Sequence, residues 1–276
     1  MMLMNKCLCT MALLHCRLPM TVAVMQITRG YIETGRRSQL NNFGGTCARR
    51  TLFPNTIERH RKMKRGALIV FEGGDHSGKT TQCTKLIQAL TSKGKNVKLL
   101  KYPDRTSTIG QMINNYLGKK CEIEDHSIHL LFSANRWEKE PIMMELLNSG
   151  TTLIVDRYAF SGVAFTAAKP GFDLEWCKQS DMGLPRPDLV LFLTLDTEAA
   201  AKRGTFGGER YEQTDFQNKV MGNFKKLKDP TWKEIDADQS IEDLHRQILN
   251  LVTQTMLAVE EKPIKKLWMP ENDKME

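Results

Sequence analysis

The chain of 276 residues can bury one sizeable core, and its 41% hydrophobic and 26% charged content is that of an ordinary globular protein. Its formal net charge of +8 arises in residues 1–62, where ten Lys and Arg face two Asp and Glu, so residues 63–276 are balanced. The body therefore needs no nucleic-acid partner to explain its charge. No run approaches the ~20 apolar residues of a membrane span, so we expect no membrane partner either.

Residues 1–62 are rich in Arg and poor in acids, a composition that resembles a mitochondrial transit peptide although serine is scarce. The alternative is a disordered leader ahead of a start at Met63. A secretory signal fits less well, because the apolar patch Met11–Leu14 is short and His15 follows it. We expect a basic extension over 1–62 and one globular domain over 63–276. The location is mitochondrial for a transit peptide, and cytoplasmic or nuclear otherwise.

Short apolar runs alternate with helix-like segments along the body. Strands are predicted at Ala67–Glu72, Val97–Tyr102, Thr151–Asp156, Leu189–Leu195 and about Trp232–Asp236. Helices are predicted at Lys79 to about Leu90, Ser107–Leu117, Asp125 toward Leu147 with a break at Pro141, Phe160–Ala168, Thr197–Arg203, Phe216–Leu227 and Ile241–Val259. Strands rich in Val, Ile and Leu between helices indicate a buried parallel sheet, hence one α/β domain.

A phosphate-binding loop follows the first predicted strand. Gly73-x-x-x-x-Gly78-Lys79-Thr80 matches the G-x-x-x-x-G-K-[ST] pattern and stands between a strand and a helix, as the pattern requires. Glycines let backbone N–H groups surround phosphate oxygens, Lys79 reaches the β- and γ-phosphates, and the Thr80 hydroxyl can bind Mg²⁺. We therefore expect a bound nucleoside triphosphate.

The loop alone does not decide the reaction. A GTPase would need an Asn-Lys-x-Asp segment, which the sequence lacks, and a motor needs more mass than this body has. A small kinase needs arginines for an anionic acceptor. Arg105 follows the second predicted strand, and Asp156-Arg157 ends the third, where an acid can organise Mg²⁺ and each arginine can bind a phosphate through two hydrogen bonds.

One predicted helix carries an aromatic residue and an arginine on the same face. Phe132 and Arg136 stand at i and i+4 in Leu130-Leu131-Phe132-Ser133-Ala134-Asn135-Arg136-Trp137. A ring beside a guanidinium suits a nucleobase, although, taken singly, Phe132 is by default a core residue and Arg136 a solvated charge.

Five motifs, taken in their order along the chain, indicate a protein family. The runs EGGDHSGKTTQ, YPDR, HLLFSANRWE, VDRYAFSGVAFTAAK and RPDLVLFLTLD together resemble the thymidylate kinase family, eukaryotic branch, from about Lys64 to Trp268. The resemblance implies a P-loop nucleoside monophosphate kinase fold with a five-stranded parallel sheet and a mobile lid. It also implies transfer of a phosphoryl group from ATP to dTMP, with Mg²⁺, in dTTP biosynthesis, by a homodimer.

The resemblance also implies a role for each site residue. In the dTMP site, Asp75 bonds the 3′-hydroxyl, Arg105 and Arg157 hold the phosphate, and Phe132 stacks on thymine. Arg136 bonds a thymine carbonyl, Phe165 crowds the 2′ position, and Tyr211 completes the dTMP site. The ATP site comprises Gly73, Ser77, Gly78, Lys79, Thr80, Thr81, Ala237 and Gln239, and the metal site Thr80 and Asp156.

Two features concern the rate of transfer. The segment Lys202–Glu212 contains three glycines and two arginines, Arg203 and Arg210. By itself it would be a solvated charged loop, but the resemblance implies a lid that closes over ATP. By resemblance, the residue after Asp75 is an arginine that stabilises the transferring phosphoryl group, whereas this sequence has His76. We therefore expect Lys79, Asp156, Arg157 and His76 to act in catalysis, with Arg203 or Arg210 supplying part of the missing charge.

Two other readings remain open. The chain could phosphorylate another nucleoside monophosphate or a deoxynucleoside, with the thymine preference lost. It could also be a non-catalytic nucleotide-binding protein that its basic arm tethers to nucleic acid. Two arginines for an acceptor phosphate count against a nucleoside acceptor. Intact Lys79, Thr80, Asp156 and Arg157 count against the second reading.

Overall fold

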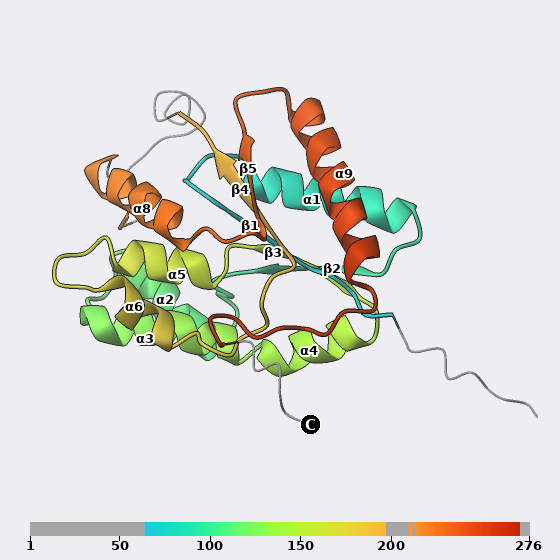
Figure 1. Cartoon of the computed structure of the whole chain (residues 1–276). Coiled ribbons are helices and arrows are strands. Elements are labelled where there is room, and N and C mark those ends of the chain that lie inside the picture. The colour runs from blue at the N-terminus through green and yellow to red at the C-terminus, as the bar shows by residue number, and fades with distance from the viewer. Residues whose placement is uncertain (1–63, 197–209, 212–213, 271–276) are drawn as a thin grey trace, which may run out of the picture. The chain divides into compact units, whose positions relative to one another are not determined.

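The computed structural model describes residues 64–196, 210–211 and 214–270, and these form an α/β domain around one parallel sheet (Figure 1). The five strands are β1 (Leu68–Gly73), β2 (Val97–Lys101), β3 (Thr152–Asp156), β4 (Leu189–Thr194) and β5 (Trp232–Asp236). Their order in the sheet is β2-β3-β1-β4-β5, and every neighbouring pair is parallel. The predicted fold class is confirmed.

The central strand explains why the sheet is parallel and buried. All six residues of β1 are buried, so both of its faces must be apolar, as its sequence Leu-Ile-Val-Phe-Glu-Gly is at its first four positions. Alternate residues point to opposite faces: Leu68 and Val70 join one core cluster, and Ile69 and Phe71 join the other. The sheet is thus covered by helices on both sides.

Helices divide between these two faces (Figure 1). One face carries α1 (Lys79–Ser92) and α9 (Ile241–Val259), whose apolar residues share a core cluster with the sheet. The other face carries α4 (Glu140–Asn148), α5 (Ala159–Thr166) and α8 (Thr214–Leu227), with the short α6 (Leu174–Gln179) packed against α5. The pair α2 (Thr108–Leu117) and α3 (Asp125–Trp137) encloses a smaller cluster of its own.

Most predicted element boundaries agree with these within one or two residues. The predicted break at Pro141 is real: α3 ends at Trp137, and α4 begins at Glu140 with the proline in its first turn, where a missing N–H costs nothing. Helix α6 was missed, because six residues are too few to show a helical period. The helix predicted at Thr197–Arg203 lies outside the described residues, as does the extension 1–62. Within the described part of the chain, no helix has the length and apolarity to cross a bilayer.

The strand register brings the site together. Phe71 of β1 pairs with Asp156 of β3, so the loop that leaves β1 begins beside the carboxyl end of β3. In a parallel sheet all carboxyl ends meet at one edge, where ligands bind.

Candidate active site

The loop after β1 has the backbone that a phosphate loop needs. Gly73 and Gly78 have φ angles of 137° and 90°, and His76 adopts 61°, a left-handed value that is costly for a side chain other than glycine. A Cβ atom on Gly73 would lie 2.3 Å from the carbonyl oxygen of Leu193, so glycine is required there on steric grounds as well. Helix α1 begins directly after Gly78, and its positive end therefore faces the loop.

The Lys79 side chain is buried inside this loop. Its Nζ atom donates to the carbonyl oxygens of Gly73 and Gly74 at 3.2 and 2.6 Å and lies 3.3 Å from Ser77 Oγ. Burial lowers the pKa of Lys79 to about 8, and the nearby Arg157 acts in the same direction, while Asp75 opposes it. Phosphate oxygens can therefore replace these carbonyl oxygens as the hydrogen-bond acceptors of the Lys79 ammonium.

Thr80 and Asp156 form the candidate metal site. The Thr80 hydroxyl donates to Asp156 Oδ2 at 2.6 Å, which places two hard oxygen donors side by side at the loop. Among the residues that the structure describes, no cluster of three or more His, Cys, Asp or Glu side chains could hold a metal by itself. The pair fits Mg²⁺, which keeps several waters and binds through one or two protein oxygens and substrate phosphates.

Asp75 sits within a network of cations. Its carboxylate pairs with Arg157 and accepts a hydrogen bond of 3.1 Å from Gln217 Nε2. Burial favours the neutral acid, but Arg157, Lys79 and His76 outweigh it and lower the pKa of Asp75, which therefore stays ionised. The sequence analysis missed Gln217, whose partner lies 142 residues away in the chain.

Glu72 is a second residue that the sequence analysis missed. Its fully buried carboxylate accepts hydrogen bonds from the Tyr158 and Ser161 backbone N–H groups, at 2.9 and 3.1 Å, and from Ser161 Oγ at 2.6 Å. Burial raises the pKa of Glu72, although these hydrogen bonds and Arg157 partly offset it. Through these hydrogen bonds, Glu72 holds the turn in which Arg157 adopts a φ angle of 66°. The sequence signal that could have identified Glu72 is an acidic residue inside an otherwise apolar strand.

The loop that carries Arg105 is held by α3. Asn135 is completely buried; its Oδ1 accepts from the Asp104 N–H at 2.7 Å, and its Nδ2 donates to the Asp104 carbonyl at 3.1 Å. Arg105 Nη1 donates to Asn114 Oδ1 at 2.8 Å, on α2. The preceding Tyr102–Pro103 bond is cis. Sequence reasoning did not assign Asn135 a role.

The base-binding candidates lie on α3 and α5. Phe132 is half-buried, and Arg136 is buried in a two-bond ion pair with Asp181. Phe165 packs edge-on against Tyr211, with ring centroids 5.6 Å apart, and the Arg157 guanidinium lies 5.7 Å from the centre of the Phe165 ring. The sequence analysis did not identify Asp181.

One cavity of about 920 Å³ joins these groups. Phosphate-loop and acceptor-side candidates line it together; they are Asp75, His76, Ser77, Gly78, Lys79, Thr80, Thr81, Arg105, Phe132, Arg136, Asp156, Arg157, Phe165 and Tyr211. Ala237 and Gln239, after β5, line it as well: the Ala237 N–H donates to the Thr194 carbonyl at 2.7 Å, which closes this turn onto β4. Gly73 belongs to the loop without lining the cavity, and Arg203 lies outside the described residues.

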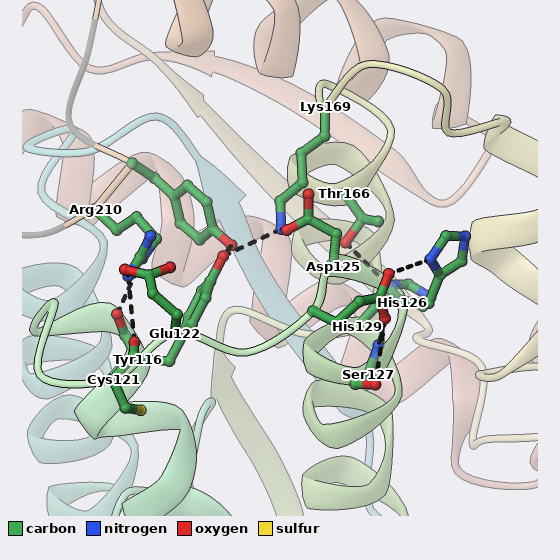
Figure 2. Close-up of polar contacts among 12 residues, drawn as sticks. Tyr116, Cys121, Glu122, Asp125, His126, Ser127, His129, Thr166, Lys169 and Arg210 are labelled. Atoms are coloured by element: carbon green, nitrogen blue, oxygen red, sulfur yellow. Dashed lines mark hydrogen bonds and ion pairs between the residues drawn. The ribbon is translucent and has the colours of Figure 1, made fainter. Parts of the chain in front are cut away.

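Arg210 is placed differently from the other predicted catalytic residues (Figure 2). Its Nε donates to the Tyr116 carbonyl at 3.1 Å, and its Nη2 contacts the Cys121 carbonyl and, at 2.7 Å, Glu122. The guanidinium lies 4.2 Å from the centre of the Tyr116 ring. Arg210 is not among the described residues that line the cavity. This arrangement favours a role in holding its own segment against α2, and its catalytic role stays a prediction.

Comparison with known proteins agrees with this geometry. A family model described as thymidylate kinase matches residues 71–248. The chain is 54% identical over 208 residues to the thymidylate kinases of Danio rerio and Homo sapiens, covering 74% of this chain and 98% of each relative. A solved structure of thymidylate kinase from Candida albicans is similar, with 39% identity, a TM-score of 0.67 and coverage of 74% of this chain and 98% of that one. The chain therefore belongs to the thymidylate kinase family.

Proposed function

We propose that this enzyme transfers the terminal phosphoryl group of ATP to dTMP, which gives ADP and dTDP for dTTP biosynthesis. The observation that carries the proposal is the single cavity, because the phosphate loop and the acceptor-side residues line it together. Family membership supports the same reaction, since a thymidylate kinase is a nucleoside monophosphate kinase that acts on dTMP.

In this proposal, the loop and the arginines hold two anions in line. Backbone N–H groups of the loop and the Lys79 ammonium bind the β- and γ-phosphates of ATP, and Arg105 and Arg157 bind the dTMP phosphate. An oxygen of the dTMP phosphate attacks the γ-phosphorus, and the bond from that phosphorus to the β,γ-bridging oxygen breaks, so ADP leaves. Mg²⁺ bound through Thr80 and Asp156 would supply positive charge to the phosphate oxygens. Residues that hold the two phosphates at the right distance supply most of the rate.

Selectivity for a thymine deoxynucleotide rests on the acceptor side. Asp75, ionised and facing Arg157, is suited to accept a hydrogen bond from the 3′-hydroxyl. Phe132 would stack on the base, Arg136 would donate to a base carbonyl, and Phe165 would exclude a 2′-hydroxyl. One methyl group discriminates by only about 1–3 kcal/mol, so we expect measurable turnover of dUMP.

His76 raises the question of transition-state charge. It stands where the family resemblance implies an arginine, and its proximity helps to lower the pKa of Asp75. A protonated imidazole beside phosphates would supply part of the charge of an arginine. Arg203 is the other proposed source. We further propose that residues 1–62 act in targeting or are a disordered leader, and that the enzyme is a homodimer.

The test is ADP release by the full-length protein with ATP and Mg²⁺ and each of dTMP, dUMP, dCMP, AMP and thymidine. We expect dTMP to be the best acceptor, dUMP to follow, and thymidine to be inactive because it has no phosphate for Arg105 and Arg157. Tight ATP binding without turnover of any acceptor would reject the proposal in favour of a nucleotide-binding protein.

A further inference from the structure

The Arg136 guanidinium is held by one carboxylate in a buried place. Its Nε and Nη2 atoms donate to Asp181 Oδ1 and Oδ2 at 2.9 and 2.6 Å. The side chains are 3% and 0% exposed, so water cannot take over either hydrogen bond. Asp181 follows α6 by two residues and is 45 residues from Arg136 in the chain.

Asp181 is itself fixed from α3. The Ser133 hydroxyl lies 2.8 Å from Asp181 Oδ1 and 2.8 Å from the Ser180 carbonyl oxygen, and Trp137 Nε1 donates to the same carbonyl at 2.8 Å. Ser133, Arg136 and Trp137 share one face of α3 by their i, i+3, i+4 spacing. The carboxylate therefore has a defined position relative to the helix that carries the arginine.

One terminal nitrogen of Arg136, Nη1, has no hydrogen-bond acceptor among the described residues. Arg136 nevertheless lines the cavity. Nη1 is not among the buried side-chain atoms that lack a partner in the described part of the chain, so it is open to the cavity, where a ligand or water can accept its hydrogen bonds. Arg136 Nη1 is therefore placed to donate a hydrogen bond to a ligand in the cavity.

Gly162 on α5 leaves room for this guanidinium. A Cβ atom there would lie 2.8 Å from Arg136 Nη2, closer than Cβ atoms come to other heavy atoms, and 3.1 Å from Nη1, so the guanidinium would have to shift. Alanine is otherwise the better helix former, so glycine at a helical position calls for a reason. Asp181 holds the guanidinium on one side. On another side, the absence of a side chain at Gly162 leaves the space that the guanidinium occupies.

We propose that Asp181 is a positioning residue for acceptor selection: it orients Arg136 so that Nη1 donates to a carbonyl group of the acceptor base. Gly162 leaves the space that this orientation of the guanidinium requires. The inference rests on the proposed function, since it presupposes dTMP as acceptor. An ion pair that only stabilised the fold would have no effect on acceptor binding in the molecules that remain folded.

The direct test is steady-state kinetics of Asp181→Asn, which keeps the shape of the side chain and removes its charge. We expect KM for dTMP to rise about tenfold or more, the scale of one hydrogen bond to a charged group, while KM for ATP stays within about twofold. Calorimetric titration with dTMP alone should show the same loss of affinity. An unchanged dTMP affinity in folded Asp181→Asn would overturn the proposal.

A double-mutant cycle tests whether Asp181 acts through Arg136. In the Arg136→Met background, Asp181→Asn should change KM for dTMP by less than about twofold, because the residue that it positions is gone. Equal effects of Asp181→Asn in both backgrounds would contradict a positioning role.

Gly162→Ala displaces the arginine without removing its partner, and Gly222→Ala on α8 is the matched control. A Cβ on Gly222 would meet nothing within 4 Å. We expect Gly162→Ala to raise KM for dTMP severalfold, and Gly222→Ala to leave it unchanged; equal KM values would count against the proposal. Wild-type turnover of dTMP is measured first, so a failure of the proposed function is seen separately from a failure of the role of Asp181.

Discussion

Two arginine–aspartate pairs of this domain, one buried (Arg136–Asp181) and one largely buried (Arg65–Asp188), differ in which arginine nitrogens lack an acceptor in the protein. Arg65 donates to Asp188 through Nη1 and Nη2, both at 2.7 Å, and its other donors reach the Gly66 carbonyl at 2.9 Å and the Lys262 carbonyl at 2.6 Å. All three nitrogens are therefore used. Arg136 also makes two hydrogen bonds to one carboxylate, but through Nε and Nη2, and its Nη1 has no acceptor among the described residues.

The surroundings explain the difference. Asp188 also accepts from the Leu68 N–H at 2.8 Å, so the first pair joins the start of β1, the start of β4 and the chain after α9. The second pair joins α3 to the segment after α6 and borders the cavity. An arginine whose three nitrogens all donate to protein serves the fold, whereas one with a nitrogen that lacks a protein acceptor and faces a cavity can donate to a ligand.

The Lys79 side chain is the hardest test of this rule, because it lines the cavity although its three acceptors all belong to the protein. These acceptors are neutral oxygens, which phosphate replaces favourably. We expect Lys79→Met to lower kcat/KM by about 10³-fold, since a preorganised cation at the transferring phosphate is lost. The free energy of unfolding should not fall, because an apolar side chain of similar size replaces a buried charge. Rates and thermal melts of the variant check both; a variant that is active, or unstable, would contradict the account.

A smaller effect follows from the pKa of Lys79. Burial lowers this pKa to about 8 from 10.5, so the charged form that binds phosphate is lost above about pH 8. We expect the Kd of ATP, measured by calorimetry, to be constant from pH 7 to 8 and then to weaken by up to about tenfold per pH unit. The unfolded chain keeps its proton up to pH 10.5, so stability should rise with pH between these two values. Lys79→Met serves as the control and should show neither dependence.

The smallest effect is expected at Arg210. Its Nε and Nη2 atoms donate to the Tyr116 and Cys121 carbonyls and to Glu122, and it is not among the described residues that line the cavity, so we expect it to serve the fold. Arg210→Ala should lower kcat by less than about fivefold, because the contact with Glu122 is an exposed ion pair. The exposed Lys219→Ala on α8 is the reference. A fall of 10²-fold or more would show instead that Arg210 leaves α2 during turnover and carries catalytic charge.

The sequence predicted much of this fold because its signals are local. The apolar run of β1, the glycines of the phosphate loop, the proline that separates α3 from α4 and the Ser240 cap of α9 each act within a few residues. The Ser240 Oγ accepts from the Asp243 N–H at 3.0 Å, as the capping pattern predicts.

The supporting residues of the site could not be predicted in this way. Gln217 meets Asp75, Asn135 meets Asp104, and Asp181 meets Arg136 across 31 to 142 residues of chain, and no local pattern encodes such pairs. A partial signal was present on α3: His129, Ser133 and Arg136 form a polar stripe, and all three are buried. Buried polar groups require partners, so the stripe predicts a polar counterpart without identifying it.

Thermal unfolding and KM for dTMP, measured on Asp181→Asn and Asp188→Asn side by side, test the central claim most directly. Both variants should lose stability, by about 3–5 kcal/mol for the buried Asp181 pair left with one charge, and by less for Asp188, whose side chain is 13% exposed. The account predicts that KM for dTMP rises about tenfold in Asp181→Asn and stays at the wild-type value in Asp188→Asn. Equal KM values in the two variants, raised or unchanged, would contradict it.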